Sequence, residues 1–412
     1  MAASSKQGAA NAWSANQLAS AHQSLPSAEY DALIIGAGIV GLSAALALHQ
    51  QGYHVAVLEH KPATTLDLNQ LDSRIYAITP GNQALLSQLQ VWQQMDASRY
   101  CTIQRMQIWA DPQQAPLQFD AFSAGISAIG YIVESQQLLH ALLQQCQQQQ
   151  VAVLFDSQLQ QVLRDPAGAL SSIHLITQQQ RLSAQLLIGA DGANSWLRQQ
   201  AAMTVKRDAY QHRALVANFS CEFDHANCAR QWFIEQDILA LLPLPNMQVS
   251  MVWSSHHAEQ LMQLDAEQLA QAVASASGMA LGQLKLLAPA QTFALAKQSV
   301  QHSVAANIVL IGDAAHTVHP MAGQGVNLGL RDVAQLASCL QHKPTNIGDY
   351  LLLRQYERAR KLDVLSMQGF THGLYVLFQQ QQTWLKKMRQ WGMQLPNRWA
   401  WLKQQLVRQA IR

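Results

Sequence analysis

The chain has 412 residues, a length that suits one large domain or two to three ordinary ones. Its composition, with 49% hydrophobic and 13% charged residues, excludes a charge-driven disordered chain and a fibrous repeat. The net charge of +2 is too small to indicate wholesale nucleic-acid binding. Five scattered cysteines without a CxxC pair argue against a disulfide framework, so we predict a cytoplasmic protein.

The first ordered elements are predicted after a polar N-terminal segment. Residues 1–28 lack the apolar run of an export signal, and we expect a flexible tail there. Tyr30–Ile35 has the pattern of a buried parallel strand, Ile39–Gln51 that of a helix, and His54–Glu59 that of a second strand. These three elements form a βαβ unit.

A glycine-rich turn, Gly36-Ala37-Gly38-Ile39-Val40-Gly41, joins the first strand to the helix. In this GxGxxG pattern Gly36 allows a tight turn, Gly38 lets a pyrophosphate approach the backbone, and Gly41 lets the helix pack on the strand. Glu59, 18 residues after Gly41, is the expected acceptor for an adenosine ribose hydroxyl. An acid at this position favours FAD or NAD over NADP.

The central part of the chain alternates helical and strand-rich segments. Helical patterns occur around Asn82–Val91 and Ser135–Gln148, whereas Thr102–Phe119 and Ala214–Trp253 are strand-rich with turn signals. Two sheets are therefore expected.

A second glycine-bearing turn follows the apolar strand Leu186–Ile188. It contains Asp191 and Gly192 and leads into a helix with Trp196. By itself an Asp-Gly pair after a strand indicates no more than a turn.

A third such turn follows the buried strand Ile308–Ile311. The carboxylate of Asp313 is suited to accept hydrogen bonds from a sugar-alcohol chain, and Gly323 and Gly325 expose the backbone before a helix that is expected to begin near Val326. A helix start aimed at an anion holds negative charge, as a reduced flavin presents.

The three glycine turns are separated by the strand-rich inserts, so we predict an α/β fold with a discontinuous Rossmann-like domain for FAD or NAD, a second β-sheet substrate domain and a C-terminal helical region. The expected boundaries are a tail, 1–28; the cofactor-binding domain in three parts, 29–100, 131–203 and 300–347; the substrate domain in two parts, 101–130 and 204–299; and basic, aromatic C-terminal helices, 348–412.

The three turns, in this order and spacing, resemble FAD-dependent aromatic hydroxylases of the para-hydroxybenzoate hydroxylase fold, and most closely the ubiquinone-biosynthesis hydroxylases of the UbiH, UbiF, UbiI and VisC type. The resemblance covers nearly all of Tyr30–Ile411. Its motifs are Asp72–Ile78, Gly130–Glu134, Ile188–Arg198, Leu241–Leu244, Gly312–Gly329 and Tyr356–Arg360.

This resemblance implies a role for each matching residue. Gly36, Gly38, Gly41 and Glu59 would hold the adenosine end of FAD, and Arg74 would lie near the middle of the cofactor. Asp191 would lie by the pyrophosphate, on the path of a pyridine nucleotide, and Asp313 would bind the ribityl chain. The residues expected to face the isoalloxazine ring are Pro320, Gly323, Gly325, Val326 and Asn327.

The implied reaction is transfer of one oxygen atom from a flavin C4a-hydroperoxide to a phenol or quinol ring, with O2 as substrate. The cofactor carries the chemistry and the protein excludes water, so His319 and Pro320 are named only for their position at the flavin face; a structural role for His319 stays open. The chain has a single dinucleotide fingerprint. NAD(P)H would therefore dock transiently, or another electron donor would replace it.

The expected substrate is a polyprenyl phenol or quinol intermediate of ubiquinone biosynthesis. Motifs around Tyr210–His212, Ala229–Gln231 and Asp349–Arg358 look most like the UbiI/VisC branch, which points to ring carbon C5. Glu235-Gln236-Asp237-Ile238 replaces a glycine-rich turn common in the family, which leaves the shape of the substrate cavity open there. Two alternatives remain: a flavin hydroxylase or reductase of a soluble aromatic compound, and a non-catalytic flavoprotein subunit of a quinone-biosynthesis complex.

The C-terminal end is a separate basic zone with no acidic residue after Asp363. Five aromatic residues between Phe370 and Trp401 alternate with Lys386, Lys387 and Arg389, as in a surface that contacts anionic lipid. We expect a peripheral contact with the inner face of the membrane, with other ubiquinone-biosynthesis proteins as further partners; an ordinary packed helical cap is the alternative.

Two groups of side chains resemble metal-binding sites. His316 and His319 lie near Asp313, and Cys221, His225 and Cys228 have soft-ligand chemistry, but each group lacks a complete ligand set. No metal is expected, and no nucleic-acid module is recognisable.

Overall fold

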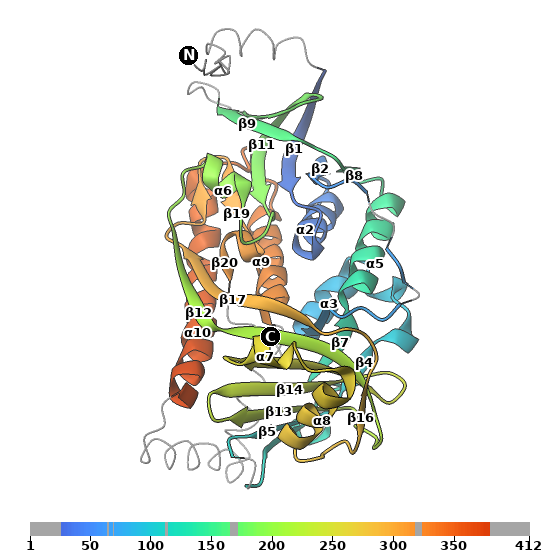
Figure 1. The fold of residues 1–412 in the computed structure, drawn as a ribbon. Helices are drawn as coiled ribbons and strands as arrows, with labels where there is room; N and C mark the ends of the chain where they lie inside the picture. Colours follow the sequence, from blue (N-terminus) through green and yellow to red (C-terminus); the bar gives the residue numbers. More distant parts are fainter. Residues whose placement is uncertain are drawn as a thin grey trace, which may run out of the picture.

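The computed structural model describes residues 26–63, 66–68, 70–111, 114–164, 172–317 and 324–379. Two large sheets lie one beyond the other along the molecule, and helices pack against each (Figure 1). The α/β fold predicted from the sequence is confirmed.

The first sheet is built from distant parts of the chain. Its parallel centre has the order β19-β11-β1-β2-β8, and antiparallel strands extend it beside β11 and β19. The parallel strands are β1 (Ser27–Ile35), β2 (Val55–Leu58), β8 (Ala152–Leu154), β11 (Arg181–Gly189) and β19 (Ile308–Leu310). The antiparallel strands are β9 (Leu159–Arg164), β10 (Ile173–Thr177) and β18 (Val304–Ala305).

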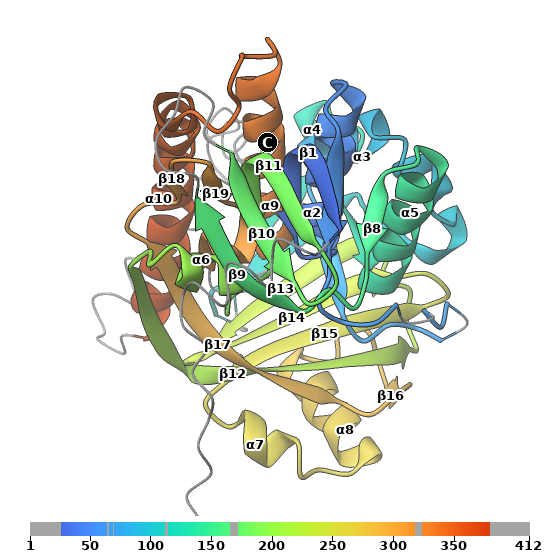
Figure 2. The ribbon, with the colours of Figure 1, turned by 90° about the horizontal axis from the view of Figure 1, so that it is seen from above.

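The second sheet is mostly antiparallel and has the order β20-β17-β12-β15-β14-β13-β5-β6, with β16 beside β12. Its strands are β5 (Arg105–Trp109), β6 (Leu117–Asp120), β12 (Val205–Cys221), β13 (Cys228–Ile234), β14 (Asp237–Leu244), β15 (Gln248–Ser255), β16 (Leu284–Leu286), β17 (Gln291–Val300) and β20 (His316–Thr317). Figure 2 shows α7 (Ala258–Leu261) and α8 (Ala266–Ala276) on the side of this sheet that faces away from the first sheet.

A third, three-stranded sheet packs between β14 of the second sheet and helices that cover the first sheet. It has the order β3-β7-β4, and its strands are β3 (Ile75–Ile78), β4 (Cys101–Ile103) and β7 (Gly130–Glu134). The sequence patterns predicted two sheets, and this small one was missed because its strands are short and come from segments far apart in the chain.

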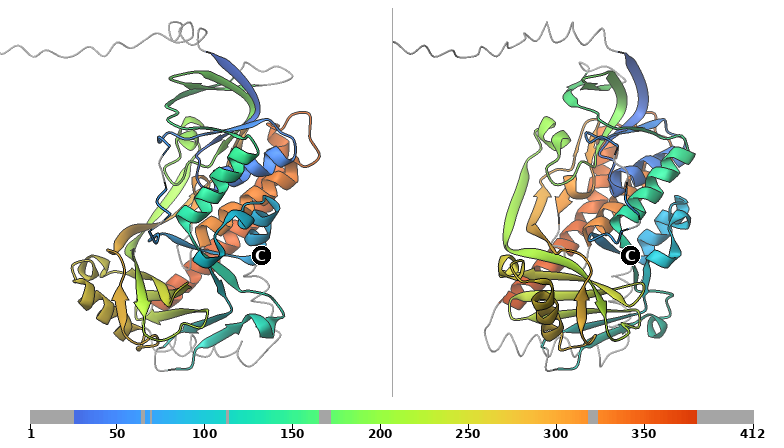
Figure 3. Two further views of the ribbon diagram at one scale, coloured as in Figure 1. Left: turned by 90° about the vertical axis from the view of Figure 1, so that its right-hand side faces the viewer. Right: turned by 45° about the vertical axis from the view of Figure 1, so that its right-hand side comes forward.

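The helices bury their apolar faces against the first sheet. One core cluster joins alternate residues of β1 and β11 to α2 (Ile39–Gln50), α5 (Ser135–Gln148) and α9 (Gln324–Leu340), and a second cluster fills the opposite face of the sheet. The long helix α10 (Tyr350–Gln379) packs beside α9, as both views of Figure 3 show. The remaining helices are short: α3 (Pro80–Gln88), α4 (Ala121–Ala124) and α6 (Trp196–Gln200).

The predicted elements correspond closely to the observed ones. The helix expected to begin near Val326 begins at Gln324, and the helical pattern expected after Gly348 is helix α10; residues 380–412 lie outside the described part of the chain. The residue ranges given for the domains stay a prediction.

Candidate functional site

The three glycine turns meet at one edge of the first sheet. They follow β1, β11 and β19, which are neighbouring parallel strands, so their carboxyl ends lie side by side. The Ala190 amide donates to the Ile35 carbonyl (2.8 Å), and the Ile311 amide donates to the Gly189 carbonyl (2.9 Å). In open α/β sheets, ligands bind outside the carboxyl ends of the strands.

The first turn needs its glycines for different reasons. Gly36 has φ +107°, and a Cβ there would lie 2.5 Å from the Ala190 carbonyl oxygen. A Cβ on Gly41 would lie 2.0 Å from the Gly36 oxygen, so helix α2 lies close against the turn. Gly38 is exposed, has open space beyond its Cα and begins α2 without a side-chain cap, so the amides at this helix end are available to an anion.

Glu59 lies beside this turn, as the sequence predicts. Its carboxylate accepts hydrogen bonds from the amides of Ala37 (Oε2, 3.0 Å) and Lys61 (Oε1, 3.0 Å). The first of these bonds holds the end of β2 against the glycine turn.

The second turn carries an incompletely bonded carboxylate. Asp191 Oδ2 accepts from the Leu197 amide (3.1 Å), while its Oδ1 atom is buried without a hydrogen-bond partner. Such an atom is stabilised when a ligand donates to it.

A buried arginine joins the second turn to the third. Arg198, at the start of α6, donates from Nη2 to the Ala193 carbonyl (2.8 Å) and from Nη1 to the Ala314 carbonyl (2.9 Å). The two turns therefore hold a fixed relative position.

The third turn is the 3₁₀ segment Gly312–Ala314, which presents Asp313. This side chain is exposed to solvent, yet the surrounding protein desolvates it enough to raise the pKa of its carboxyl, against the opposing effects of His316 and Arg74. A Cβ on Gly325, at the start of α9, would lie 3.8 Å from Asp313 Oδ1. The carboxylate thus lies beside the start of α9.

Asn327 lies fully buried among structural partners. Its Oδ1 accepts from the Thr79 amide (3.0 Å) and from Asn82 Nδ2 (2.8 Å), and its own Nδ2 donates to the Ala77 carbonyl (2.6 Å). These bonds lock α9 to β3 and α3, and they orient the Asn327 side chain toward β3 and α3. The ring-facing role predicted for this residue stays a prediction.

The structure gives less detail on the other residues predicted for the site. Arg74 is exposed just before β3, with its guanidinium 5.5 Å from the centre of the Tyr76 ring. Gly325 and Val326 are partly exposed at the start of α9. His319, Pro320 and Gly323 lie outside the described residues.

The structure adds a buried charge network that the sequence analysis missed. The Asp332 carboxylate, fully buried in α9, accepts from the Gly312 amide (2.8 Å), His316 Nε2 (2.6 Å) and Arg360 Nε (2.6 Å). Burial raises the pKa of Asp332, but His316, Arg360 and the Gly312 amide outweigh it and lower the pKa. In the sequence, this network is indicated only by a carboxylate among the apolar residues of α9.

The second sheet has one face that packs with α8 and an opposite face that carries both small and large apolar side chains. Its outward residues, such as Leu215 and Met251, pack with α8, so alternate residues such as Val216 and Ala240 point the other way. Asn218 on this face donates from Nδ2 to the Asp72 carbonyl (2.9 Å), two residues before Arg74. This face is suited to an apolar, ring-shaped ligand.

The residues fit a bound FAD. Uncapped helix amides suit a pyrophosphate, and the carboxylates of Glu59 and Asp313 suit hydroxyl groups on either side of it. The unpartnered oxygen of Asp191 adds a further acceptor between them.

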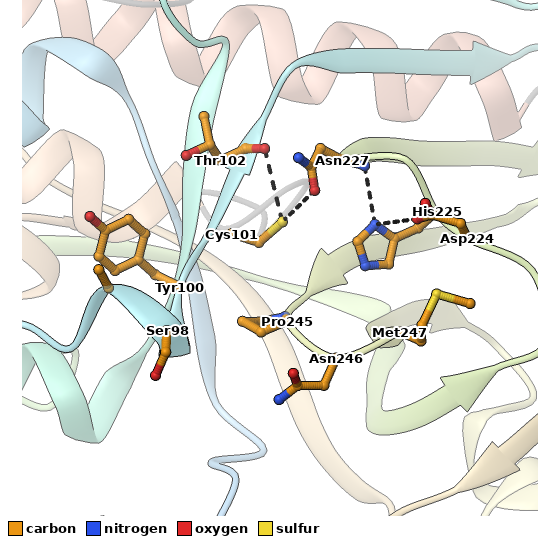
Figure 4. Close-up of a pocket in the computed structure, with 11 residues that line it drawn as sticks. Ser98, Tyr100, Cys101, Thr102, Asp224, His225, Asn227, Pro245, Asn246 and Met247 are labelled. Atoms are coloured by element: carbon orange, nitrogen blue, oxygen red, sulfur yellow. Dashed lines mark hydrogen bonds and ion pairs between the residues drawn. The ribbon is translucent and has the colours of Figure 1, made fainter.

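A separate cavity of about 370 Å³ lies between β4, the loop after β12 and the turn after β14 (Figure 4). It is lined by residues such as Tyr100, Asn227 and Met247, none of which was predicted for the site. Cys101 lies in it, and burial raises the pKa of its thiol to about 11, so the thiol stays protonated at neutral pH.

The histidines of the two groups that resemble metal-binding sites form hydrogen bonds with other protein groups. His225 uses Nε2 with the Leu244 carbonyl (2.8 Å) and Nδ1 with the Asn227 amide (3.1 Å). His316 is bonded to Asp332. Among the described residues there is no group of three or more His, Cys, Asp or Glu side chains that could hold a metal ion.

No helix in the described ranges is long and apolar enough to span a membrane.

Comparison with known proteins identifies relatives over almost the whole chain. Residues 29–368 match the family described as FAD binding domain. The Escherichia coli K12 protein 3-demethoxyubiquinol 3-hydroxylase is 34% identical, over 92% of this chain and 97% of its own length. The human protein named ubiquinone biosynthesis monooxygenase COQ6, mitochondrial, is 31% identical, over 92% of each chain.

Solved structures show the same fold at lower identity. Pseudomonas aeruginosa PqsL in complex with 2-aminobenzoylacetate has a TM-score of 0.72 and 21% identity, covering 85% of this chain and 97% of that one. The p-nitrophenol 4-monooxygenase PnpA from Pseudomonas putida DLL-E4 has a TM-score of 0.74 and 15% identity, covering 94% of this chain and 97% of that one.

Proposed function

Because the chain belongs to the FAD binding domain family, within the ubiquinone-biosynthesis hydroxylases, we propose that it hydroxylates the aromatic ring of a polyprenyl phenol or quinol intermediate. The observation that carries this proposal is the convergence of three chain-distant turns on one edge of the first sheet. The named activities of the relatives supply the substrate class.

Each turn has a part in the proposed cofactor site. The amides around Gly38 hold the pyrophosphate, with Asp191 of the second turn beside it. Glu59 holds the adenosine ribose, and Asp313 accepts from the ribityl hydroxyls. When bound, FAD supplies the oxygen-transfer chemistry with O2 as substrate. The chain itself orients the two reactants and excludes water.

The residues near the flavin ring remain part of the proposal. We expect Gly325 and Val326, at the partly exposed start of α9, to line it, and Arg74 to lie near the middle of the cofactor. His319, Pro320 and Gly323 complete the ring face by their place in the sequence between Asp313 and Gly325.

Reducing equivalents come from NAD(P)H, docked transiently, or from another donor. The first sheet has one glycine-rich fingerprint, at Gly36–Gly41, and FAD occupies it. A stopped-flow measurement of flavin bleaching with NADH, NADPH and a reduced ferredoxin identifies the donor.

The test of function is deletion of the gene followed by mass analysis of accumulated quinone precursors. We expect a prenylated precursor that lacks one oxygen, restored by the wild-type gene and not by Asp313→Ala. The position of the missing oxygen tells whether the ring carbon is C5, as the sequence motifs indicate, or the position named for the E. coli relative. Normal quinone levels, or accumulation of an aromatic compound without a prenyl tail, would contradict the proposal.

We also propose a cytoplasmic protein that contacts the inner face of the membrane through its C-terminal region. The unpaired state of all five cysteines supports a reducing compartment. The basic, aromatic segment around Lys386 and Lys387 lies outside the described residues, so its sequence alone supports the contact. Flotation with phosphatidylglycerol vesicles tests it, and we expect loss of flotation in a variant with Lys386, Lys387 and Arg389 changed to Ala.

A further inference from the structure

We propose that Asp332 is a positioning residue for FAD: from inside the core it holds the Gly312–Ala314 turn that presents Asp313, without contact with the cofactor. The inference rests on the proposed function only in taking Asp313 as a residue that binds FAD.

The first argument is the geometry of the Asp332 carboxylate. It is fully buried and receives donors from three separate parts of the chain: the turn itself, strand β20 and helix α10. The donor of the turn is the amide of Gly312, at 2.8 Å from Oδ2. One side chain of α9 therefore ties together the elements around the third glycine turn.

The second argument is the direction that this bond imposes on the turn. Gly312 has φ +59°, and its amide points to the Asp332 carboxylate on α9. The next side chain, Asp313, is exposed beside Gly325. Loss of the bond to Asp332 frees the start of the turn, and the Asp313 carboxylate then loses a fixed orientation.

The third argument is that the rest of the turn is held by buried side chains as well. Gln298 Nε2 donates to the Asp313 carbonyl (3.4 Å), and Arg198 Nη1 donates to the Ala314 carbonyl (2.9 Å). These two hold carbonyl oxygens, while Asp332 holds the amide at the start of the turn. The backbone of Asp313 is therefore anchored on both sides.

The fourth argument is that this position requires a carboxylate. Asp332 receives three donors and offers none, whereas an asparagine amide would place its own N–H groups against one of them. The guanidinium of Arg360 is also buried and needs a negative partner. An uncharged residue of the same shape cannot serve both functions.

The test compares Asp332→Asn with a matched control, Asp363→Asn. Asp363 belongs to the same ion-pair network, because it pairs with Arg360 and with Arg331, but it has no contact with the turn. FAD affinity is measured on the full chain by titration of the refolded apoprotein, with the absorption spectrum of the bound flavin recorded. For Asp332→Asn we expect the FAD Kd to rise about tenfold or more, and for Asp363→Asn it stays within about twofold.

A second pair of variants keeps the proposal testable if Asp332→Asn does not fold. His316→Leu removes one donor to the carboxylate and leaves the Asp332–Arg360 pair intact, whereas His316→Gln keeps an N–H donor at that position. We expect weaker FAD binding and an altered flavin spectrum for His316→Leu, and recovery for His316→Gln. A purely structural role would lower the melting temperature without changing the Kd of the folded protein.

The outcomes separate the two proposals. If the Asp332 and His316 variants bind FAD with wild-type Kd, or if Asp363→Asn weakens binding as much as Asp332→Asn, the positioning role is overturned. If Asp313→Ala also keeps wild-type affinity, the proposed cofactor site is wrong instead.

Discussion

At the residue scale, glycines 36 and 38 have opposite requirements although they are two positions apart. Gly36 combines φ +107° with a backbone oxygen that would lie 2.5 Å from an added Cβ atom, whereas Gly38 has φ −81° and open space around it. The first glycine serves the fold, and we propose that the second serves a ligand.

We predict that Gly36→Ala destabilises the protein by about 1–3 kcal/mol, since alanine must adopt a strained conformation in a crowded site. Gly38→Ala is the matched control: its stability without FAD stays within about 0.5 kcal/mol of wild type, but its Cβ obstructs the approach of the pyrophosphate. Urea unfolding of the apoprotein and FAD titration measure the two effects. Equal stability losses in both variants would contradict this assignment.

The charge of Asp313 lowers the stability of the apoprotein, although we propose that the same carboxylate binds FAD. Its raised pKa means that the folded apoprotein disfavours the charged form, so this carboxylate lowers stability as pH rises above its ordinary pKa, about 3.9. We predict that Asp313→Asn makes the apoprotein at least as stable as wild type at pH 7 while FAD affinity falls. Thermal melts with and without FAD check this, and a destabilised variant apoprotein would count against it.

At the element scale, the three turns keep their relative positions because buried side chains connect the elements that carry them. Arg198 connects α6 to the Gly312–Ala314 turn, and Asn327 connects α9 to β3 and α3. Without these side chains, these elements would be connected only through the loops between them.

We predict that Arg198→Met destabilises the protein by about 1–3 kcal/mol, because two buried carbonyls lose their donor. It should also weaken FAD binding by loosening the second and third turns together. Arg207→Met, at an exposed position in β12, is the control and should leave both unchanged. Urea unfolding and FAD titration would refute the link if the two variants behave alike.

The Asp332 network predicts that the protein loses stability in acid. Because the pKa of Asp332 is lowered in the folded protein, its stabilising contribution is present above the ordinary carboxyl pKa, about 3.9, and is lost as pH falls through the lowered value. We expect the stability of Asp332→Asn to depend less on pH than that of wild type below about pH 4. Unfolding free energies measured from pH 2 to 6 would show parallel curves if the prediction is wrong.

At the scale of the whole molecule, one cofactor is predicted to hold distant parts of the chain together. The turns after β1, β11 and β19 come from residues near 36, 191 and 313. FAD that bridges them should stabilise the domain as a unit and not a single segment.

We therefore predict that FAD at 100 times its Kd raises the unfolding free energy by about 2.7 kcal/mol and protects the amides of all three strands from hydrogen exchange. Exchange measured by mass spectrometry, with and without FAD, resolves the strands separately. Protection confined to β1 and α2 would show that the second and third turns do not take part. Asp313→Ala is the control variant. In it, the FAD-dependent protection from hydrogen exchange should fall most at β19.

Local sequence patterns were enough to predict the βαβ unit and the three glycine turns, because glycine conformations, strand patterns and helix starts are properties of neighbouring residues; the choice of FAD over NAD came from the resemblance to a family. Only the folded chain reveals that Asp332 meets His316 and Arg360, that Arg198 bridges two turns, that Asn327 bonds to β3, and that a small third sheet packs between the second sheet and the helices of the first. Those contacts depend on which distant segments pack together, and burial gives them their strength, so no local pattern contains them.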